Sequence, residues 1–429
     1  MRRRLSLKKL LGTLAAVPLL LAGSALAQDA PPVTTVGTVF PYTGGGAEWG
    51  QVMQRSADLA AKQINEAAQQ ILGGPVIELV HEDSATSPSV GVDRARKLID
   101  VDGAPVVIGT WSSGVATAIA DAVTMPNDIL HVVPVATSPL ITYLPSDVND
   151  MLFRTIGADD QQGIVAAMLA RGELLDGVSY DTASIVYENS PYGQGLMDTF
   201  VQSFEARGGT VLTTVGIPTE PQPTYSGVIE ELLEGDPDVV LPIIYPNTGG
   251  VLLAEMRDNY GYTSWQFVDA MRALDVVEAI GEDVVEGSYG TTPAADMDSE
   301  GYQRFADLYE EEYGHEPPLS FMDTTYDAAV VTGLAIASAV AAGDEITPQN
   351  LRDHLRRVAE APGEAVFVGE IERALELLAA GEDIDYSGAA SGIDFDENGQ
   401  VITPVEVWQF TGGGIETVEM LGSEDIPLE

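Results

Sequence analysis

The chain has 429 residues, with 66 acidic residues against 20 basic ones and no cysteine. This length fits two domains better than a single hydrophobic core. The negative charge repels nucleic acid and anionic lipid, so we expect no nucleic-acid partner, and the lack of cysteine excludes disulfides and thiol chemistry.

The first 27 residues are typical of a secretory signal peptide. A basic start precedes the apolar residues 10–23, which are too few to span a membrane stably, and Ala25-Leu26-Ala27 is a cleavage pattern. We expect cleavage after Ala27 and a periplasmic protein without a lipid anchor, since no cysteine can carry the lipid. No other stretch is expected to cross a bilayer. The remaining chain has 15 basic and 66 acidic residues, a net charge of −51, which we interpret as a solvated surface suited to a salty environment.

Short β-branched runs alternate with helical patterns from residue 33 onward. In the first half, we predict strands at 33–40, 76–80, 105–108 and 131–135. Helical spacing lies between these strands. Such alternation predicts a parallel sheet with helices on both faces.

A second series of the same type begins after Phe153-Arg154-Thr155. Its predicted strands are 183–187, 210–215, 239–244 and 266–268. Four helical stretches follow at 299–313, 323–342, 347–361 and 370–380. The turn 397–399 between residues 393–395 and 401–410 is a hairpin signal.

These patterns predict an α/β fold of two doubly wound parallel-sheet lobes. We expect one lobe to comprise residues 33–156 and 293–400, and the other 157–292 and 401–429, joined by a hinge of several short crossings. Ligands of such sheets bind beyond the carboxyl ends of the strands, so a cleft between two facing edges is the expected site.

The loop 108–114, Ile-Gly-Thr-Trp-Ser-Ser-Gly, lies between a predicted strand and a predicted helix. The hydroxyls of Ser112 and Ser113 suit an anionic group such as a carboxylate. They also suit a simple helix cap, and this stretch alone leaves both interpretations open.

Aromatic residues follow several predicted strands at the same edge. Trp49, Tyr192 and Tyr245 each come a few residues after a strand. Core packing accounts for any one of them, but three in equivalent loops favour a role in enclosing a ligand.

The sequence offers little for catalysis, metals or cofactors. The loop 109–114 lacks the spacing of a G-x-S-x-G nucleophile elbow, the four histidines are scattered, and no P-loop or dinucleotide fingerprint occurs. Residues 394–399 imitate half of a calcium loop, but Val405 stands where a Glu is needed, which favours a turn. We therefore expect neither an enzyme nor a cofactor.

Ordered motifs across the chain resemble a known family, the periplasmic solute-binding proteins of branched-chain amino acid (Leu/Ile/Val-type) ABC transporters, with the type I periplasmic binding protein fold. The resemblance runs from about residue 36 to 410. The motifs that carry it are Ala47-Glu48-Trp49-Gly50, the Ser112-Ser113 loop, the segment 134–139, Phe153-Arg154-Thr155, the segment 190–195, Tyr245 and Tyr326-Asp327.

The resemblance implies a role for each of these loops. Ser113 and Thr137 would bind a ligand carboxylate, assisted by backbone groups from Trp111 to Ser113, including Ser112, and at Val135. Trp49 would cover the ligand side chain, and Tyr192 and Tyr245 would close from the second lobe.

One position departs from the family pattern. Met271 stands where a Glu usually takes the ligand ammonium, and Asp269, two residues earlier, could supply the charge. The resemblance implies a branched-chain or other apolar amino acid as the first ligand candidate, and the departure at Met271 leaves urea, a short amide and an aromatic or organic acid open.

The resemblance also implies partners, a membrane ABC permease and its ATPase, and we expect a monomer. A ligand-sensing receptor module of the same fold is an alternative.

Overall fold

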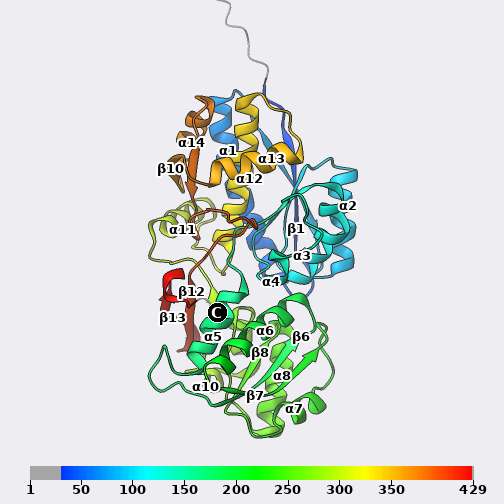
Figure 1. Ribbon diagram of the computed structural model, residues 1–429, viewed down its shortest axis with the longest axis vertical. Coiled ribbons are helices and arrows are strands. Elements are labelled where there is room, and N and C mark those ends of the chain that lie inside the picture. Colours follow the sequence, from blue (N-terminus) through cyan, green and yellow to red (C-terminus); the bar gives the residue numbers. More distant parts are fainter. Residues whose placement is uncertain (1–29, 428–429) are drawn as a thin grey trace, which may run out of the picture.

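The computed structural model describes residues 30–427, which form two lobes, each built on a parallel sheet (Figure 1). The fold class expected from the sequence is confirmed. The expected signal peptide at residues 1–27 lies outside the described residues.

The upper lobe in Figure 1 contains a five-stranded parallel sheet in the order β2-β1-β3-β4-β5. Its strands are β1 (Thr34–Phe40), β2 (Ile77–Asp83), β3 (Val106–Gly109), β4 (Leu130–Val133) and β5 (Leu152–Arg154). All four residues of β3 are buried. Val106 and Ile108 belong to the main core, whereas Val107 packs in a separate cluster. Helices therefore cover both faces of the sheet, as apolar strands of this kind require.

Helices from both ends of the described chain build this lobe. They are α1 (Ala47–Ile71), α2 (Pro88–Asp100), α3 (Ser113–Ile119), α4 (Pro139–Thr142), α11 (Glu300–Tyr313), α12 (Met322–Ala342), α13 (Pro348–Ala359) and α14 (Ile371–Ala379). A small parallel pair, β10 (Glu364–Phe367) and β11 (Ile384–Ser387), lies beside them.

The helix α12 corrects one expectation from the sequence. Its 21 residues have a mean hydropathy of 1.5 and are long and apolar enough to cross a membrane, the only such helix among the described residues. In the fold it packs against α1, α13 and α14, and 83% of its most apolar window is buried. It is therefore a core helix, and its composition reflects burial on all sides.

The lower lobe has a parallel sheet in the order β7-β6-β8. Its strands are β6 (Thr182–Glu188), β7 (Thr210–Ile217) and β8 (Val239–Ile243). The surrounding helices are α5 (Asp159–Ala170), α6 (Pro191–Ala206), α7 (Ser226–Leu232), α8 (Pro246–Glu255), α9 (Leu274–Ile280) and α10 (Glu282–Val285). The strand expected at 266–268 does not form: Trp265 and Phe267 make only isolated bridges to Val240 and Gly290.

The expected hairpin at 393–410 is wrong in position. Residues 396–400 do turn, with the Gly399 amide donating to the Asp396 carbonyl, but no paired strands flank them. The hairpin lies instead between β12 (Val405–Thr411) and β13 (Gly414–Leu421), and β12 also pairs with β9 (Tyr289–Pro293). Gly412 and Gly413 both have positive φ, as a two-residue turn between twisted strands requires.

Three chain segments that connect the lobes lie side by side. The Gly157 amide donates to Thr403 Oγ1 at 3.1 Å, and the Ala294 amide donates to the Pro404 carbonyl at 3.0 Å. A Cβ at position 157 would lie 2.5 Å from Thr403 Oγ1, so this crossing requires glycine. The lobes are thus connected by three chain segments that are hydrogen-bonded to one another.

Candidate ligand site

The upper rim of the site consists of loops at the carboxyl ends of β1, β3 and β4. Trp49 lies in the first turn of α1, Trp111 and Ser112 precede α3, and Ser113 begins it. The hydroxyl of Ser112 makes no capping bond to α3. The Tyr245 hydroxyl donates to Ser112 Oγ at 3.3 Å instead, and the Ser138 amide donates to Ser113 Oγ at 3.3 Å. Neither serine therefore serves only as a helix cap.

A buried histidine inside the upper lobe supports this rim. The Nε2 atom of His131 lies 2.7 Å from the Gly109 carbonyl, and Nδ1 lies 3.2 Å from Thr124 Oγ1. Burial lowers the pKa of His131 to about 4. The ring is therefore neutral at pH 7, donates from Nε2 and fixes the end of β3 without adding charge.

The lower rim carries phenols from the corresponding loops of the second sheet. Tyr192 follows β6 at the start of α6, and Tyr245 follows β8 at the start of α8. The Tyr192 hydroxyl donates to Asp269 Oδ1 at 2.7 Å. The two tyrosines therefore occupy equivalent positions, each in a loop between a parallel strand and the helix that follows it.

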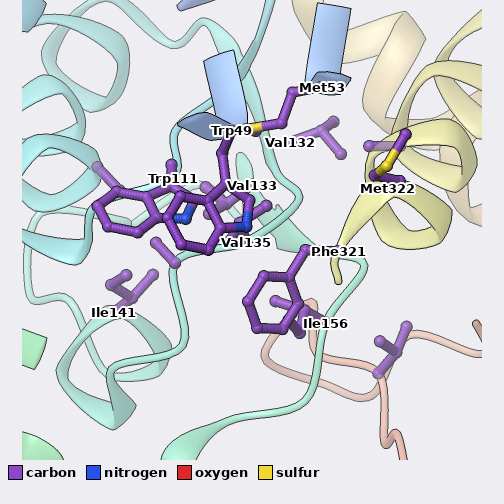
Figure 2. Packing of buried hydrophobic residues seen from close by; sticks show 14 of the residues in the cluster. Trp49, Met53, Trp111, Val132, Val133, Val135, Ile141, Ile156, Phe321 and Met322 are labelled. Carbon is purple, nitrogen blue, oxygen red and sulfur yellow. The ribbon is translucent and has the colours of Figure 1, made fainter. Parts of the chain in front are cut away.

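Aromatic rings join the two rims. The rings of Trp49 and Trp111 are 5.0 Å apart between centroids, those of Trp111 and Tyr245 are 4.5 Å apart, and those of Tyr245 and Tyr192 are 5.7 Å apart. Figure 2 shows Trp49 and Trp111 packed together beside Val135. The ring contacts thus run from the upper lobe into the lower one.

Two carboxyl groups lie buried at the lower side. Asp159 begins α5, and its Oδ2 accepts from Thr137 Oγ1 at 2.9 Å, while Asp269 Oδ1 also accepts from Gln162 Nε2 at 3.1 Å. Burial, and for Asp159 also the nearby charge of Asp269, raises the pKa of both carboxyls. Asp159 Oδ1 has no hydrogen-bond partner among residues 30–427. A cationic group placed between the two carboxyls would relieve both costs.

These groups surround one cavity in which about 20 Å³ is accessible to the centre of a water molecule. It is lined by Trp49, Trp111, Ser113, Val135, Thr137, Tyr192, Tyr245, Asp269, Ala270 and Phe321. The structure thus brings together eight of the nine residues expected from the sequence. The ninth, Ser112, contacts the set through Tyr245. Met271 does not line the cavity, because its side chain packs over Gly249.

Several residues of the site were not expected from the sequence. Asp159 follows the end of a strand, as Trp49 and Tyr245 do, so the same rule could have found it. Gln162 comes one helical turn later and is recognisable only through its contact with Asp269. Phe321 follows no strand, and no local signal marks it.

Among the described residues, no group of three or more His, Cys, Asp or Glu side chains is arranged to hold a metal ion. The site combines hydroxyl donors, phenols, two carboxyls and apolar rings. This set can bind a small polar molecule with an apolar part, and the two carboxyls favour a positive charge on it.

The sequence and fold match known proteins over most of the chain. The profile of a family described as periplasmic binding protein matches residues 33–414. A chemotactic signal transduction system substrate-binding protein, BasB from Halobacterium salinarum, is 28% identical over 91% of this chain and 90% of its own length.

Two solved structures share the fold. The leucine-binding protein LivK from Thermotoga maritima has a TM-score of 0.74 and 23% identity, over 92% of this chain and all of that one. A solute-binding protein of an ABC transporter from R. palustris, in complex with benzoate, has a TM-score of 0.67 and 21% identity, over 91% of this chain and 96% of that one.

Proposed function

The chain belongs to the periplasmic binding protein family, and we propose that it captures an α-amino acid between its lobes and delivers it to a membrane ABC permease with its ATPase. One observation carries the proposal. Hydroxyls of the upper rim and the Asp269 carboxyl of the lower rim line the same cavity between the lobes, and Asp159 lies behind it, bonded to Thr137. An α-amino acid carries the two opposite charges that these groups can bind.

In this proposal, Ser113 and Thr137 bind the ligand carboxylate. The Thr137 hydroxyl donates to Asp159 in the present arrangement. If Asp159 takes up a proton, it can donate in turn to Thr137 Oγ1, and the threonine hydroxyl is then free to donate to the ligand. The raised pKa of Asp159 supports this exchange.

The ligand ammonium is then placed at the lower rim. Asp269 holds it, in place of the glutamate that the family pattern leads one to expect at Met271, and Asp159, protonated at Oδ2, offers its unpaired Oδ1 as a second acceptor. The rings of Trp49, Trp111 and Phe321 give the remaining wall an apolar surface. This wall favours an apolar stem on the side chain, as in leucine, isoleucine or valine.

The two lobes would close over the ligand by bending at the three crossings near Gly157, Ala294 and Thr403. We propose that one lobe comprises residues 33–156 and 293–400 and that the other comprises residues 157–292 and 401–429. Contacts from both rims would hold the closed form, which the permease would recognise. The family acts outside the cytoplasmic membrane, and we propose export with cleavage after Ala27.

Thermal-shift measurements on the purified chain test this function. A ligand that binds only the folded form raises the melting temperature. We expect leucine to stabilise more than 4-methylpentanoate, which lacks the ammonium, and more than 3-methylbutylamine, which lacks the carboxylate. Benzoate and urea are tested in the same way, as representatives of the other ligand classes. Stabilisation by benzoate or urea but by no amino acid would contradict the proposal.

A sensing role is the second candidate, because the relative from Halobacterium salinarum is described as part of a chemotactic signal transduction system. In that case the closed form would be recognised by a receptor instead of a permease. Deletion of the gene separates the two roles. A transport role predicts loss of ligand uptake, and a sensing role predicts loss of chemotaxis with uptake intact.

A further inference from the structure

A second cavity adjoins the ligand site at Phe321. About 130 Å³ of it is accessible to the centre of a water molecule, against about 20 Å³ in the ligand site. Phe321 is the one residue that lines both cavities. Both lobes and all three crossings contribute to its walls, including Ile156, Ala294 and Thr403. The ligand site and a larger space therefore meet at one residue, Phe321.

Hydrogen bonds fix the backbone of Phe321, whereas its ring is held by packing alone. Its φ of 70° lies in the left-handed region, which non-glycine residues rarely adopt. The Phe321 carbonyl accepts bonds from the hydroxyls of Thr324 and Thr325 at 3.0 and 2.8 Å. Figure 2 shows the ring beside Ile156, which also lines the second cavity. Rotation of the ring, with the backbone unchanged, would connect the two spaces.

Polar groups line part of the second cavity. The Arg272 guanidinium donates from Nη1 to Ser320 Oγ at 3.1 Å and from Nη2 to Glu406 Oε1 at 3.0 Å. Its Nε–H is buried without an acceptor in the part of the chain that the structure describes. Within residues 30–427, the carboxyl of Asp323 is bonded to backbone amides alone, those of Asp323 and Thr324. The cavity therefore offers one unused donor and one carboxylate with free acceptor capacity.

These charges lie near one another. Asp323 and Glu406 both raise the pKa of the Tyr302 hydroxyl, which burial raises most, and Arg272 lowers it. Burial raises the pKa of Asp323 to about 6, so this carboxyl is mostly ionised at neutral pH. Apolar residues, including Phe305 and Leu319, supply most of the other lining residues.

We propose that this second cavity is a side-chain subsite of the ligand site and that it takes an α-amino acid with an uncharged carboxamide at the end of its side chain, of which glutamine is the simplest. An amide accepts from Arg272 Nε–H and donates to Asp323. A carboxylate would meet the charges of Asp323 and Glu406, and an ammonium would leave Arg272 Nε–H without an acceptor. The apolar stem passes the ring of Phe321. This inference rests on the proposed function and extends its ligand class.

A ligand series on the unaltered full chain tests the subsite without any mutation. Isothermal titration calorimetry compares leucine, glutamine, glutamate and lysine at pH 7.5. We expect glutamine to bind about tenfold tighter than glutamate or lysine, since only the amide satisfies both polar groups. Glutamate or lysine binding as tightly as glutamine would overturn the subsite. Leucine binding without glutamine binding would overturn it and leave the proposed function standing, whereas the binding of no amino acid would overturn both.

A substitution that keeps the ion pair gives a second test. Arg272→Lys retains a cation for Glu406 but removes the Nε–H donor. We expect the ratio of glutamine to leucine affinity to fall about tenfold. The matched control is Arg304→Lys, on the exposed face of α11, where Arg304 pairs with Glu300. An unchanged ratio in Arg272→Lys, with the control also unchanged, would contradict the subsite.

Discussion

The two rims of the ligand site have the same architecture and opposite chemistry. Both consist of loops between a parallel strand and a helix. The upper rim presents neutral hydroxyls, supported by the uncharged ring of His131. The lower rim presents carboxyls and phenols, and the pKa of Asp269 and of Tyr192 is raised by burial. The fold thus places the loops, whereas residue type sets their chemistry; in the proposed function, the ligand carboxylate lies at the upper rim and its ammonium at the lower rim.

A third buried carboxyl, that of Glu188, lies behind the lower rim. It ends β6, and its Oε1 accepts from the Tyr245 amide at 3.0 Å, while Oε2 is buried without a partner among residues 30–427. Burial raises the pKa of Glu188 to about 8. Glu188 is therefore mostly protonated and uncharged at pH 7, and the lower rim holds carboxyls whose ionisation burial disfavours, which the upper rim does not.

The largest expected effect comes from Asp269→Asn, which removes the charge that distinguishes the lower rim. We expect leucine to bind about 100-fold more weakly, because a buried ammonium loses its partner. The affinity for 4-methylpentanoate, which has no ammonium, changes little. Calorimetric titration of both ligands checks this, and equal losses for the two would remove Asp269 from the ammonium role.

A smaller loss is expected at the upper rim from Thr137→Ala. The variant lacks the hydroxyl for the ligand carboxylate and leaves Asp159 without its donor, a cost of about 1–3 kcal/mol in binding free energy. Thr137→Ser keeps the hydroxyl and is the control. The same titrations measure both variants, and equal affinities for alanine and serine at this position would contradict the proposed contact.

Contact between the rims is tested by Gly195→Ala. A Cβ at this position would lie 2.8 Å from Pro139 Cδ and 3.0 Å from Ser138 Oγ, across the boundary between α4 and α6. We expect about fivefold weaker leucine binding, since closure becomes less favourable. In Gly227→Ala, the added Cβ would contact nothing within 4 Å. Equal affinities in the two variants would show that this contact does not limit closure.

The smallest effect concerns the ionisation of the buried Glu188 carboxyl. Its pKa in the fold is raised, so the stability that its protonated form provides is full below about pH 4.5 and is lost as the pH rises through about 8. Glu188→Gln cannot ionise. We therefore expect its melting temperature to exceed that of the unaltered chain by about 2 °C at pH 9 and to match it at pH 4.5.

The exposed Glu372→Gln on α14 is the control for this measurement. Thermal unfolding at the two pH values compares both variants with the unaltered chain. A difference at Glu188 that is the same at pH 4.5 and pH 9 would exclude ionisation as its cause.

Errors in the sequence-based predictions share one physical origin. The turn at 396–400 has the residues of a hairpin turn, but the strand that pairs with β12 comes later, and its partner on the other side is β9, more than 100 residues earlier. The apolar composition of α12 indicates burial without saying whether lipid or protein provides it. In both cases the local pattern is real, and its partner lies far away in the sequence.

The sequence by itself determined the alternation of strands and helices, hence two parallel sheets, and the loops at their carboxyl ends that hold Trp49, Ser113, Tyr192 and Tyr245. Hydrophobic periodicity is local, so a short window contains it. Only the tertiary structure decided that Asp159 faces Thr137 and Asp269, and that Phe321 lines two cavities at once. These contacts join elements remote in the chain, and packing between such elements leaves no periodic signal in either of them.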